Sequence, residues 1–512
     1  MAFHQRHPSH RVAALTRPRL HPLSAPPRGR LTGLLWLVLP VIALAGCKVS
    51  KDQVRGWGDS KDAYRLAKVV KDGKQKLGVR QEAAYQLVRI ERFYELEKAL
   101  KDTKRDEAHP IVADLAKRLM PVLKQGGGDP TEIVRAKDGL FSAWYFAAPK
   151  VRRQIEPALA DWIVNGPYGE GGDHPIRKIL NALGRRGANL VAERVPVDSP
   201  QLYVYDKNKV VSDLCLLGYF WRTAGPSVRA ATARRFMKAV NKNKALAVKN
   251  QGAALLAIGA IGGPVGVDFL LRLMSQDKDI KVRAFAAVAL RIAAKTKRSL
   301  VGPAVRDAAI GELKRIMKIL GEDKPPPNPT VRGVSYIEHL LELVLLFKGE
   351  PVFSGLTPVI DTPYIALKEP DYQGIRTFVR LLSIHFLMRL DAARALRLAY
   401  AKLPKEEPYP LGYLKPTVLQ GVESAWKKKP QRRPALLAAI RQGLSGPTWV
   451  AKIIAVELLG SKVLTPRKNL AADIASLKAL YGDQTALSGS DWQGATLGAQ
   501  AKKAVESLGK TK

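Results

Sequence analysis

Hydrophobic and polar positions alternate with helical spacing from about residue 60 to the end of the chain. The apolar segments span about 12–20 residues and are separated by short breaks rich in Gly, Pro, Asp or Asn. Runs that alternate with a period of two are nearly absent, and the best strand candidate is the short segment 201–206, QLYVYD. The pattern predicts an all-α protein.

A repeated unit is clearest between Gly252 and Ala294. Its first helix is expected to end at the break Gly262-Gly263-Pro264. A second helix follows, then an acidic turn, Asp277-Lys278-Asp279, and then a third helix that starts near Val282-Arg283. Small residues on these helices would let neighbouring helices approach closely. Repeats of this kind predict a stack in which each unit packs mainly on its neighbours.

This unit strongly resembles HEAT repeats, in particular the short variety found in phycobilisome-lyase proteins. The resemblance rests on the acidic turn, the Val-Arg pair, and Ala and Leu at helical spacing. It implies an α-solenoid of helix pairs, with irregular or inserted helices where the pattern fades. It also implies that Asp279 and Arg283, next to Val282, bond between successive repeats and fix their stacking. Weaker copies of the pattern begin at three further pairs: Val79-Arg80, Ile176-Arg177 and Val228-Arg229.

The proline-rich segment 323–330 is the sharpest break in the body of the chain, because proline cannot continue a helix. We therefore expect four parts. Residues 1–46 are a signal peptide, 47–322 a HEAT-like solenoid, 323–330 a linker, and 331–512 a helical region of degenerate repeats.

The N-terminus has the form of an export signal. Residues 31–46, LTGLLWLVLPVIALAG, are apolar and follow Arg28 and Arg30. The run ends in Leu44-Ala45-Gly46-Cys47, which resembles the lipobox of bacterial lipoproteins at all four positions. The resemblance implies cleavage before Cys47, with diacylglycerol on its thiol and an acyl chain on its new amine. Several acyl chains hold a protein at a membrane lastingly.

Two other interpretations of this segment stay open: an ordinary secretory signal with a chance cysteine, and an uncleaved anchor. Whether translation begins at Met1 or at a downstream codon is also open. Lys48 follows the cysteine, where Asp would resemble an inner-membrane retention signal in enteric bacteria. We therefore expect a bacterial cell-envelope protein, on the outer membrane rather than the inner, that faces the periplasm or the cell surface. Cys215, the other cysteine, is expected to be a buried small hydrophobe.

The net positive charge of the chain indicates a further candidate partner. The chain has 84 Lys and Arg against 45 Asp and Glu. The first 46 residues hold six Arg and no acid, which leaves +33 of the total +39 on the rest. Such a field attracts anionic polymers or lipid, although a basic proteome produces the same excess without any anionic partner. An anionic envelope polymer is therefore one candidate partner. Nucleic acid is not expected, because no known binding module is present and export removes the protein from the chromosome.

The sequence contains no recognisable catalytic or metal motif. The Gly-rich segments 124–130 and 166–175 lack the Lys-Ser/Thr ending of a phosphate-binding loop. His109, His174, His339 and His385 lie far apart, and each is expected to be exposed or at the edge of the core. A GxSxG or SxxK motif is also absent. We expect neither a cofactor nor a metal, apart from the covalent lipid.

The leading hypothesis is therefore a membrane-anchored, non-enzymatic scaffold that binds a protein partner on the solenoid surface. An envelope enzyme that acts on glycan through an unrecognised site is one alternative. A secretion or assembly accessory protein is another.

Overall fold

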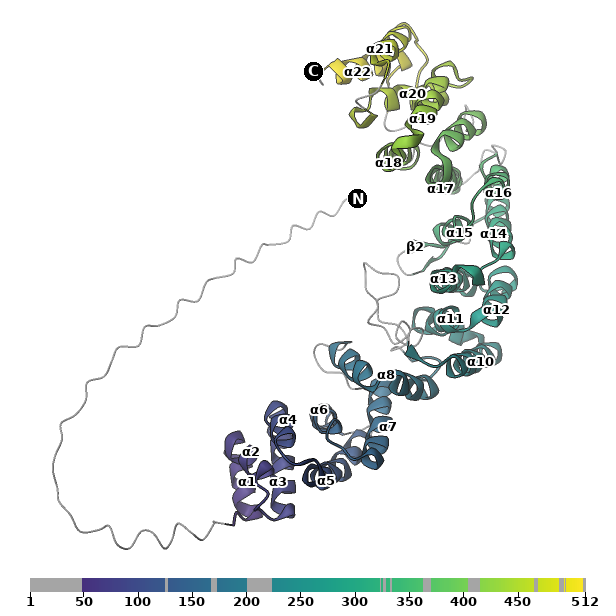
Figure 1. Cartoon of the computed structure of the whole chain (residues 1–512). Coiled ribbons are helices and arrows are strands. Elements are labelled where there is room, and N and C mark those ends of the chain that lie inside the picture. The colour runs from purple at the N-terminus through teal and green to yellow at the C-terminus, as the bar shows by residue number, and fades with distance from the viewer. Residues whose placement is uncertain are drawn as a thin grey trace, which may run out of the picture.

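The structure is a computed structural model of the chain. It describes residues 48–124, 128–166, 173–199, 223–322, 324–325, 328–331, 334–361, 370–403, 415–464, 468–487, 492 and 494–509. The described residues are almost entirely helical, and the helices follow one another along a curved stack (Figure 1). The predicted all-α solenoid is confirmed.

The N-terminal part consists of two rows of helices. One row contains α1 (Lys51–Asp59), α3 (Leu77–Arg89), α5 (Arg105–Lys124) and α7 (Pro149–Asn165). The other contains α2 (Ala63–Lys71), α4 (Phe93–Lys101) and α6 (Pro130–Trp144). Helices of one row pack on the next member of the same row, as α1 does on α3 and α2 on α4. Next comes α8 (Asp173–Arg194), which bends at Gly184, where φ is +59°.

The central part keeps this two-row arrangement. The outer side of the curve is formed by α10 (Pro226–Lys242), α12 (Gly263–Gln276), α14 (Pro303–Gly321) and α16 (Glu350–Ile360). The inner side is formed by α11 (Lys249–Ile261), α13 (Ile280–Thr296), α15 (Tyr336–Val344) and α17 (Pro370–Lys402) (Figure 1). Short 3₁₀ turns, η2 (Lys244–Ala247) and η3 (Arg298–Leu300), connect some of the helices.

The C-terminal part is less regular. A π-turn, η5 (Lys415–Leu419), leads into α18 (Gln420–Lys428), followed by α19 (Arg433–Gln442), α20 (Trp449–Gly460), α21 (Leu470–Lys478) and α22 (Leu497–Gly509). The 3₁₀ turns η6 (Pro430–Arg432), η7 (Gly443–Ser445) and η8 (Lys462–Leu464) lie between them. Helix α20 packs on α22, and α17 packs on both α18 and α19.

The proline-rich segment ends α14 but does not interrupt the stack. Two short antiparallel strands, β1 (Thr330–Val331) and β2 (Val334–Ser335), follow the prolines and lead into α15. Helix α14 packs on α15 and α16, and α13 packs on α15, so both rows continue past the segment. The break therefore separates two helices that belong to one continuous stack.

Local sequence explains why the helices begin where they do. Ser50 and Ser335 form capping boxes with Gln53 and Glu338 at the starts of α1 and α15. Proline occupies the first turn of many helices, where its missing N–H costs nothing.

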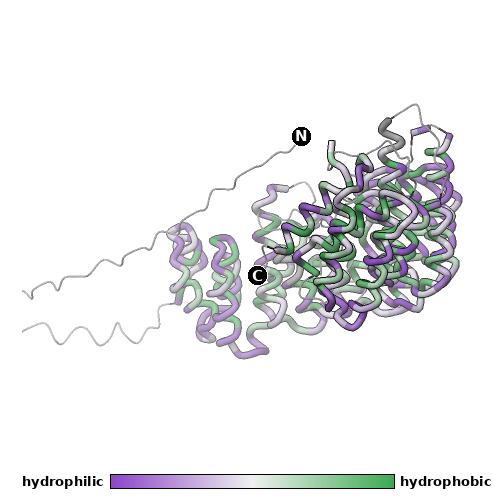
Figure 2. The backbone as a smooth tube through the Cα atoms, turned by 90° about the horizontal axis from the view of Figure 1, so that it is seen from above, coloured by the Kyte–Doolittle hydropathy of each residue, from purple (hydrophilic) through white to green (hydrophobic). Residues whose placement is uncertain are grey.

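The core is a single hydrophobic cluster that extends from Val54 to Leu508. Hydrophobic and hydrophilic residues alternate along most of the helices, as expected for helices with one buried face (Figure 2). All of the clustered residues belong to the stack that begins after Cys47. Residues 48–512 therefore contain the whole described core.

Candidate binding surfaces

The predicted lipidation site, Leu44-Ala45-Gly46-Cys47, lies outside the described residues, as do Cys215 and the strand candidate 201–206. The three repeat residues are described. Val282 is buried in α13. The Asp279 side chain accepts a hydrogen bond from the Lys281 backbone N–H and so caps α13, whereas Arg283 Nη1 donates to Glu312 Oε1 of α14 over 3.1 Å. Arg283 therefore makes the contact to the next repeat. Asp279 acts within its own helix, which differs from the shared role expected of the two residues.

Glu312 joins three consecutive helices. Its buried carboxylate accepts from Arg283 of α13, from Arg315 of its own helix, and from the Tyr336 hydroxyl of α15 over 3.3 Å. Burial of Tyr336, together with the negative charge of Glu312, holds the pKa of the Tyr336 hydroxyl well above its usual range. The hydroxyl therefore remains a hydrogen-bond donor.

The weaker repeat at Val79-Arg80 contains the same kind of contact. Arg80 is buried in α3, and its Nη1 donates to Glu107 of α5 over 2.7 Å. Its Nε donates to the Val70 carbonyl oxygen at the end of α2 over 2.9 Å. The arginine of the Val-Arg pair thus connects neighbouring repeats at two distant places in the stack.

The densest basic cluster, residues 427–434, also has a structural use. Lys429 Nζ and Arg432 Nη1 donate to the carbonyl oxygens of residues 389 and 390, over 2.6 and 2.7 Å, where the first part of α17 ends. Arg433 Nε donates to the Trp426 carbonyl over 2.9 Å. Cations are favoured at helix C-termini, whose last carbonyls lack partners within the helix. Lys427 and Lys428 are exposed.

Burial lowers the pKa of Lys429, and the nearby charge of Arg432 adds to this effect.

A comparable contact occurs in α10, where Arg235 Nη2 donates to the Ala192 and Val195 carbonyls at the end of α8. Burial lowers the pKa of Arg235 as well. Part of the positive charge therefore closes helix ends between repeats.

His339 is fully buried in α15, which corrects the expectation of an exposed or core-edge histidine. Its Nε2 lies 3.1 Å from the Val331 carbonyl oxygen, and its Nδ1 lies 2.6 Å from Arg291 Nη1. A carbonyl can only accept and a guanidinium can only donate, so Nε2 carries the proton and the ring is neutral. His339 thus ties the short β-hairpin to α13 and has a structural role.

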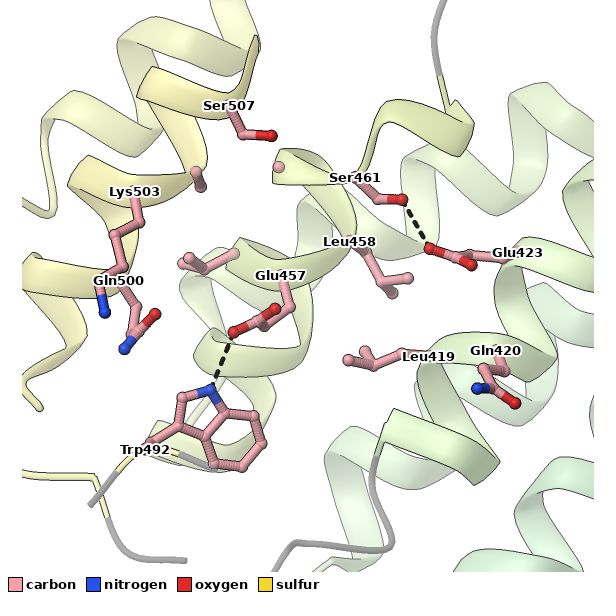
Figure 3. Close-up of a pocket in the computed structure, with 13 residues that line it drawn as sticks. Leu419, Gln420, Glu423, Glu457, Leu458, Ser461, Trp492, Gln500, Lys503 and Ser507 are labelled. Carbon is pink, nitrogen blue, oxygen red and sulfur yellow. Dashed lines mark hydrogen bonds between the residues drawn. The ribbon is translucent and has the colours of Figure 1, made fainter. Parts of the chain in front are cut away.

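A hollow of about 540 Å³ lies near the C-terminus between α18, α20 and α22 (Figure 3). Val456, Glu457, Leu458 and Gly460 of α20 form its floor. Figure 3 shows Gln500, Lys503 and Ser507 of α22 on one side, and Leu419, Gln420 and Glu423 of η5 and α18 on the other. We refer to this hollow as the C-terminal groove.

Two carboxylates in the C-terminal groove are held by neutral donors. Trp492 Nε1 donates to Glu457 over 2.9 Å, and the Ser461 hydroxyl donates to Glu423 over 2.6 Å. Neither glutamate forms an ion pair with a described residue, whereas many acids elsewhere in the stack do, such as Glu107 and Glu312. The groove therefore offers two oriented carboxylates against one lining cation, Lys503, in a strongly basic protein. No local sequence pattern indicates this arrangement, because the residues come from separate helices.

A second groove of about 440 Å³ lies between α17 and α18. It is lined by His385, Met388 and Arg389 of α17 and by Gly421, Ser424 and Lys428 of α18. His385 Nδ1 lies 2.6 Å from the Thr417 carbonyl oxygen. The lining is basic, so two neighbouring grooves, which share α18 as a wall, have opposite charge.

Over the described part of the chain, no group of three or more His, Cys, Asp or Glu residues is placed to hold a metal ion. Within the same residues, no helix combines the length and the apolar character needed to cross a bilayer.

The fold thus defines the chain as an α-solenoid. No protein-family model matches it, and no curated protein matches its sequence. Among solved structures it is similar to a crystal complex of SYS-1 and POP-1, with 11% identity and a TM-score of 0.26, over 90% of this chain and 93% of that chain. A likeness of that strength carries no conclusion about function.

Proposed function

We propose that the protein is a membrane-anchored lipoprotein of the bacterial cell envelope and that its α-solenoid is a non-enzymatic scaffold for a protein partner. The pair of grooves along α17, α18, α20 and α22 supports this proposal most directly. Adjacent grooves of opposite charge suit an extended segment of another protein that carries both signs. Charged groups arranged in this way give specificity more than affinity.

In this proposal the anchor is lipid on Cys47, with diacylglycerol on the thiol and an acyl chain on the amine. We expect metabolic labelling with palmitate to mark the wild-type chain and the Cys215→Ser variant equally, and to leave Cys47→Ser unlabelled. Cys215 is the other cysteine of the chain, so this variant is a matched control. Labelling of Cys47→Ser at the wild-type level would remove the anchor from the proposal.

The partner is accessible to crosslinking in native membranes. We expect pull-down of the crosslinked wild-type protein to enrich a protein that is depleted when Glu423→Gln and Glu457→Gln are combined. A control with Glu95→Gln and Glu97→Gln, on α4 far from the groove, should retain it. Equal recovery from both double variants would reject the grooves as the partner site. If the recovered protein belonged to a secretion or assembly machine, the scaffold would be an accessory of that machine.

The location of the anchored protein is proposed as the outer membrane, because Lys48 follows Cys47. Separation of inner and outer membranes on a density gradient tests this assignment. In an enteric host, Lys48→Asp should shift the protein toward the inner membrane. Wild-type protein that already sediments with the inner membrane would contradict the assignment.

An enzyme that acts on envelope glycan is the second candidate. The two glutamates of the C-terminal groove favour it, because glycoside hydrolysis uses a pair of carboxylates on either side of a bond. Release of soluble fragments from purified cell-wall glycan by the wild-type protein, abolished by Glu457→Gln, would establish this activity. Absence of release, together with an intact partner complex, would leave the scaffold as the function.

A further inference from the structure

We infer that the first helix units of the solenoid form a second membrane contact, a basic face with tyrosine that rests on anionic phospholipid headgroups. The inference deepens the proposed function and rests on it in one respect: the lipid on Cys47 brings this face to the bilayer. The surface is formed by the exposed side chains of residues 48–76, which come from α1, α2 and the turns beside them, and it is called the anchor-proximal face below.

Charge on the anchor-proximal face is strongly positive. It contains nine Lys or Arg and four Asp, a net charge of +5 over 29 residues. All nine cations are exposed: Lys48, Lys51, Arg55, Lys61, Arg65, Lys68, Lys71, Lys74 and Lys76. Each basic side chain near an anionic membrane surface adds to the attraction.

Helix α2 arranges its cations on one side. Tyr64, Arg65, Lys68 and Lys71 are exposed, and their spacing places them on one face of the helix. Leu66, Val69 and Val70 occupy the opposite face and are buried. Acids only partly offset these charges: Arg65 pairs with Asp62 over 3.2 Å, and Lys71 lies 3.9 Å from Asp102, the residue that follows α4.

Large exposed hydrophobic side chains gather at the same end of the stack. Of the five found among the described residues, Tyr64, Leu77 and Tyr94 lie within or next to the first units. Tyr64 is 79% exposed and Tyr94 is 73% exposed. They are the second residues of α2 and α4, which pack side by side. Tyrosine is favoured at the membrane–water interface because its ring is apolar and its hydroxyl is polar.

The short connection between Cys47 and α1 favours the bilayer as the partner of this face. Helix α1 starts at Lys51, four residues after Cys47. Four extended residues span about 14 Å at most, and a nine-residue helix such as α1 or α2 is about 13 Å long. A lipidated Cys47 therefore keeps the first units within a few tens of ångströms of the headgroups, while the C-terminal groove can project away from them.

Binding of the lipid-free chain 48–512 to vesicles tests the inference, because this chain retains the whole described core. We expect it to sediment with vesicles of phosphatidylcholine and phosphatidylglycerol at low salt, and at least tenfold less with pure phosphatidylcholine. The double variant Lys68→Glu with Lys74→Glu should weaken the first interaction at least tenfold. Tyr64→Ser should weaken it several-fold.

The matched control reverses Lys314 and Lys318, two exposed cations on α14 of the outer row. This Lys314→Glu, Lys318→Glu variant changes the net charge equally and should bind like the parent. Equal weakening by both double variants would show that only the overall charge matters, and it would overturn the inference. Equal sedimentation of the parent with both kinds of vesicle would also overturn it. The palmitate experiment is separate, so failure of the anchor and failure of this face are distinguishable.

Discussion

Single acids hold buried arginines at the joints between repeats. Arg283 depends on Glu312, and Arg80 depends on Glu107. A buried charge that loses its partner is strongly destabilising, whereas a buried pair replaced by apolar groups is often neutral. Because of this asymmetry, replacing an acid alone should destabilise the fold strongly, as replacing an arginine alone would.

We therefore expect Glu312→Ala to lower the free energy of unfolding by about 3–5 kcal/mol. The variant leaves Arg283 buried without its ion-pair partner and removes the acceptor of the Tyr336 hydroxyl. Urea denaturation followed by circular dichroism measures the change. Replacing both partners, Arg283→Met with Glu312→Leu, should recover most of the loss. A double variant less stable than Glu312→Ala would contradict this account.

Glu82 gives the stack a dependence on pH. Burial raises the pKa of its carboxyl, but hydrogen bonds from Gln86 and Arg118 outweigh burial and hold that pKa below the ordinary value of 4.5. Because the pKa of Glu82 is lower in the folded state than in the unfolded state, the ionised carboxylate stabilises the fold above pH 4.5. This stability is lost as the pH falls through the pKa of the folded state. We expect Glu82→Gln to be less stable than wild type at pH 7 and to lose less stability between pH 5 and 3. If the free energies of unfolding of wild type and Glu82→Gln changed in parallel with pH, this role of Glu82 would be excluded.

At the scale of elements, close contact between helices depends on glycine at particular positions. A Cβ on Gly259 of α11 would collide with the Ala289 carbonyl oxygen of α13. The two inner helices therefore meet backbone to backbone, as the small residues of this unit predicted. The predicted order of a helix, a break at Gly262, a second helix, an acidic turn and a third helix also matches α11, α12 and α13.

We expect Gly259→Ala to lower the free energy of unfolding by about 1–3 kcal/mol, because one of the two backbones must move. Gly311→Ala on α14 is the matched control, since no atom lies within 4 Å of the added methyl group. There alanine should be neutral or stabilise by roughly 0.5–1 kcal/mol, because glycine weakens a helix interior. Thermal unfolding of the three proteins measures both effects, and equal midpoints for the two variants would refute the close contact.

At the scale of the whole molecule, a solenoid transmits a defect mainly to its neighbours. We expect Gly259→Ala to speed amide hydrogen exchange in α10–α13 and in α15, because α10, α12 and α15 are the helices that pack on α11 and α13. Exchange in α1–α4 and in α20–α22 should remain near the wild-type rate. Mass spectrometry of peptic fragments resolves these regions, and uniform acceleration along the chain would indicate one cooperative body instead of a stack.

The helical class could be predicted from the local pattern alone, because the spacing of apolar residues is a property of each helix that does not depend on its neighbours. It also determined the three-helix order of the Gly252–Ala294 unit, through its glycines, proline and acidic turn. The lipid on Cys47 remains a prediction of the sequence. The partner of Arg283, the burial of His339 and the grouping of Glu423 with Glu457 could be seen only in the folded chain. These residues meet partners about 30–50 positions away, and that distance is set by how the repeats stack and not by the local pattern.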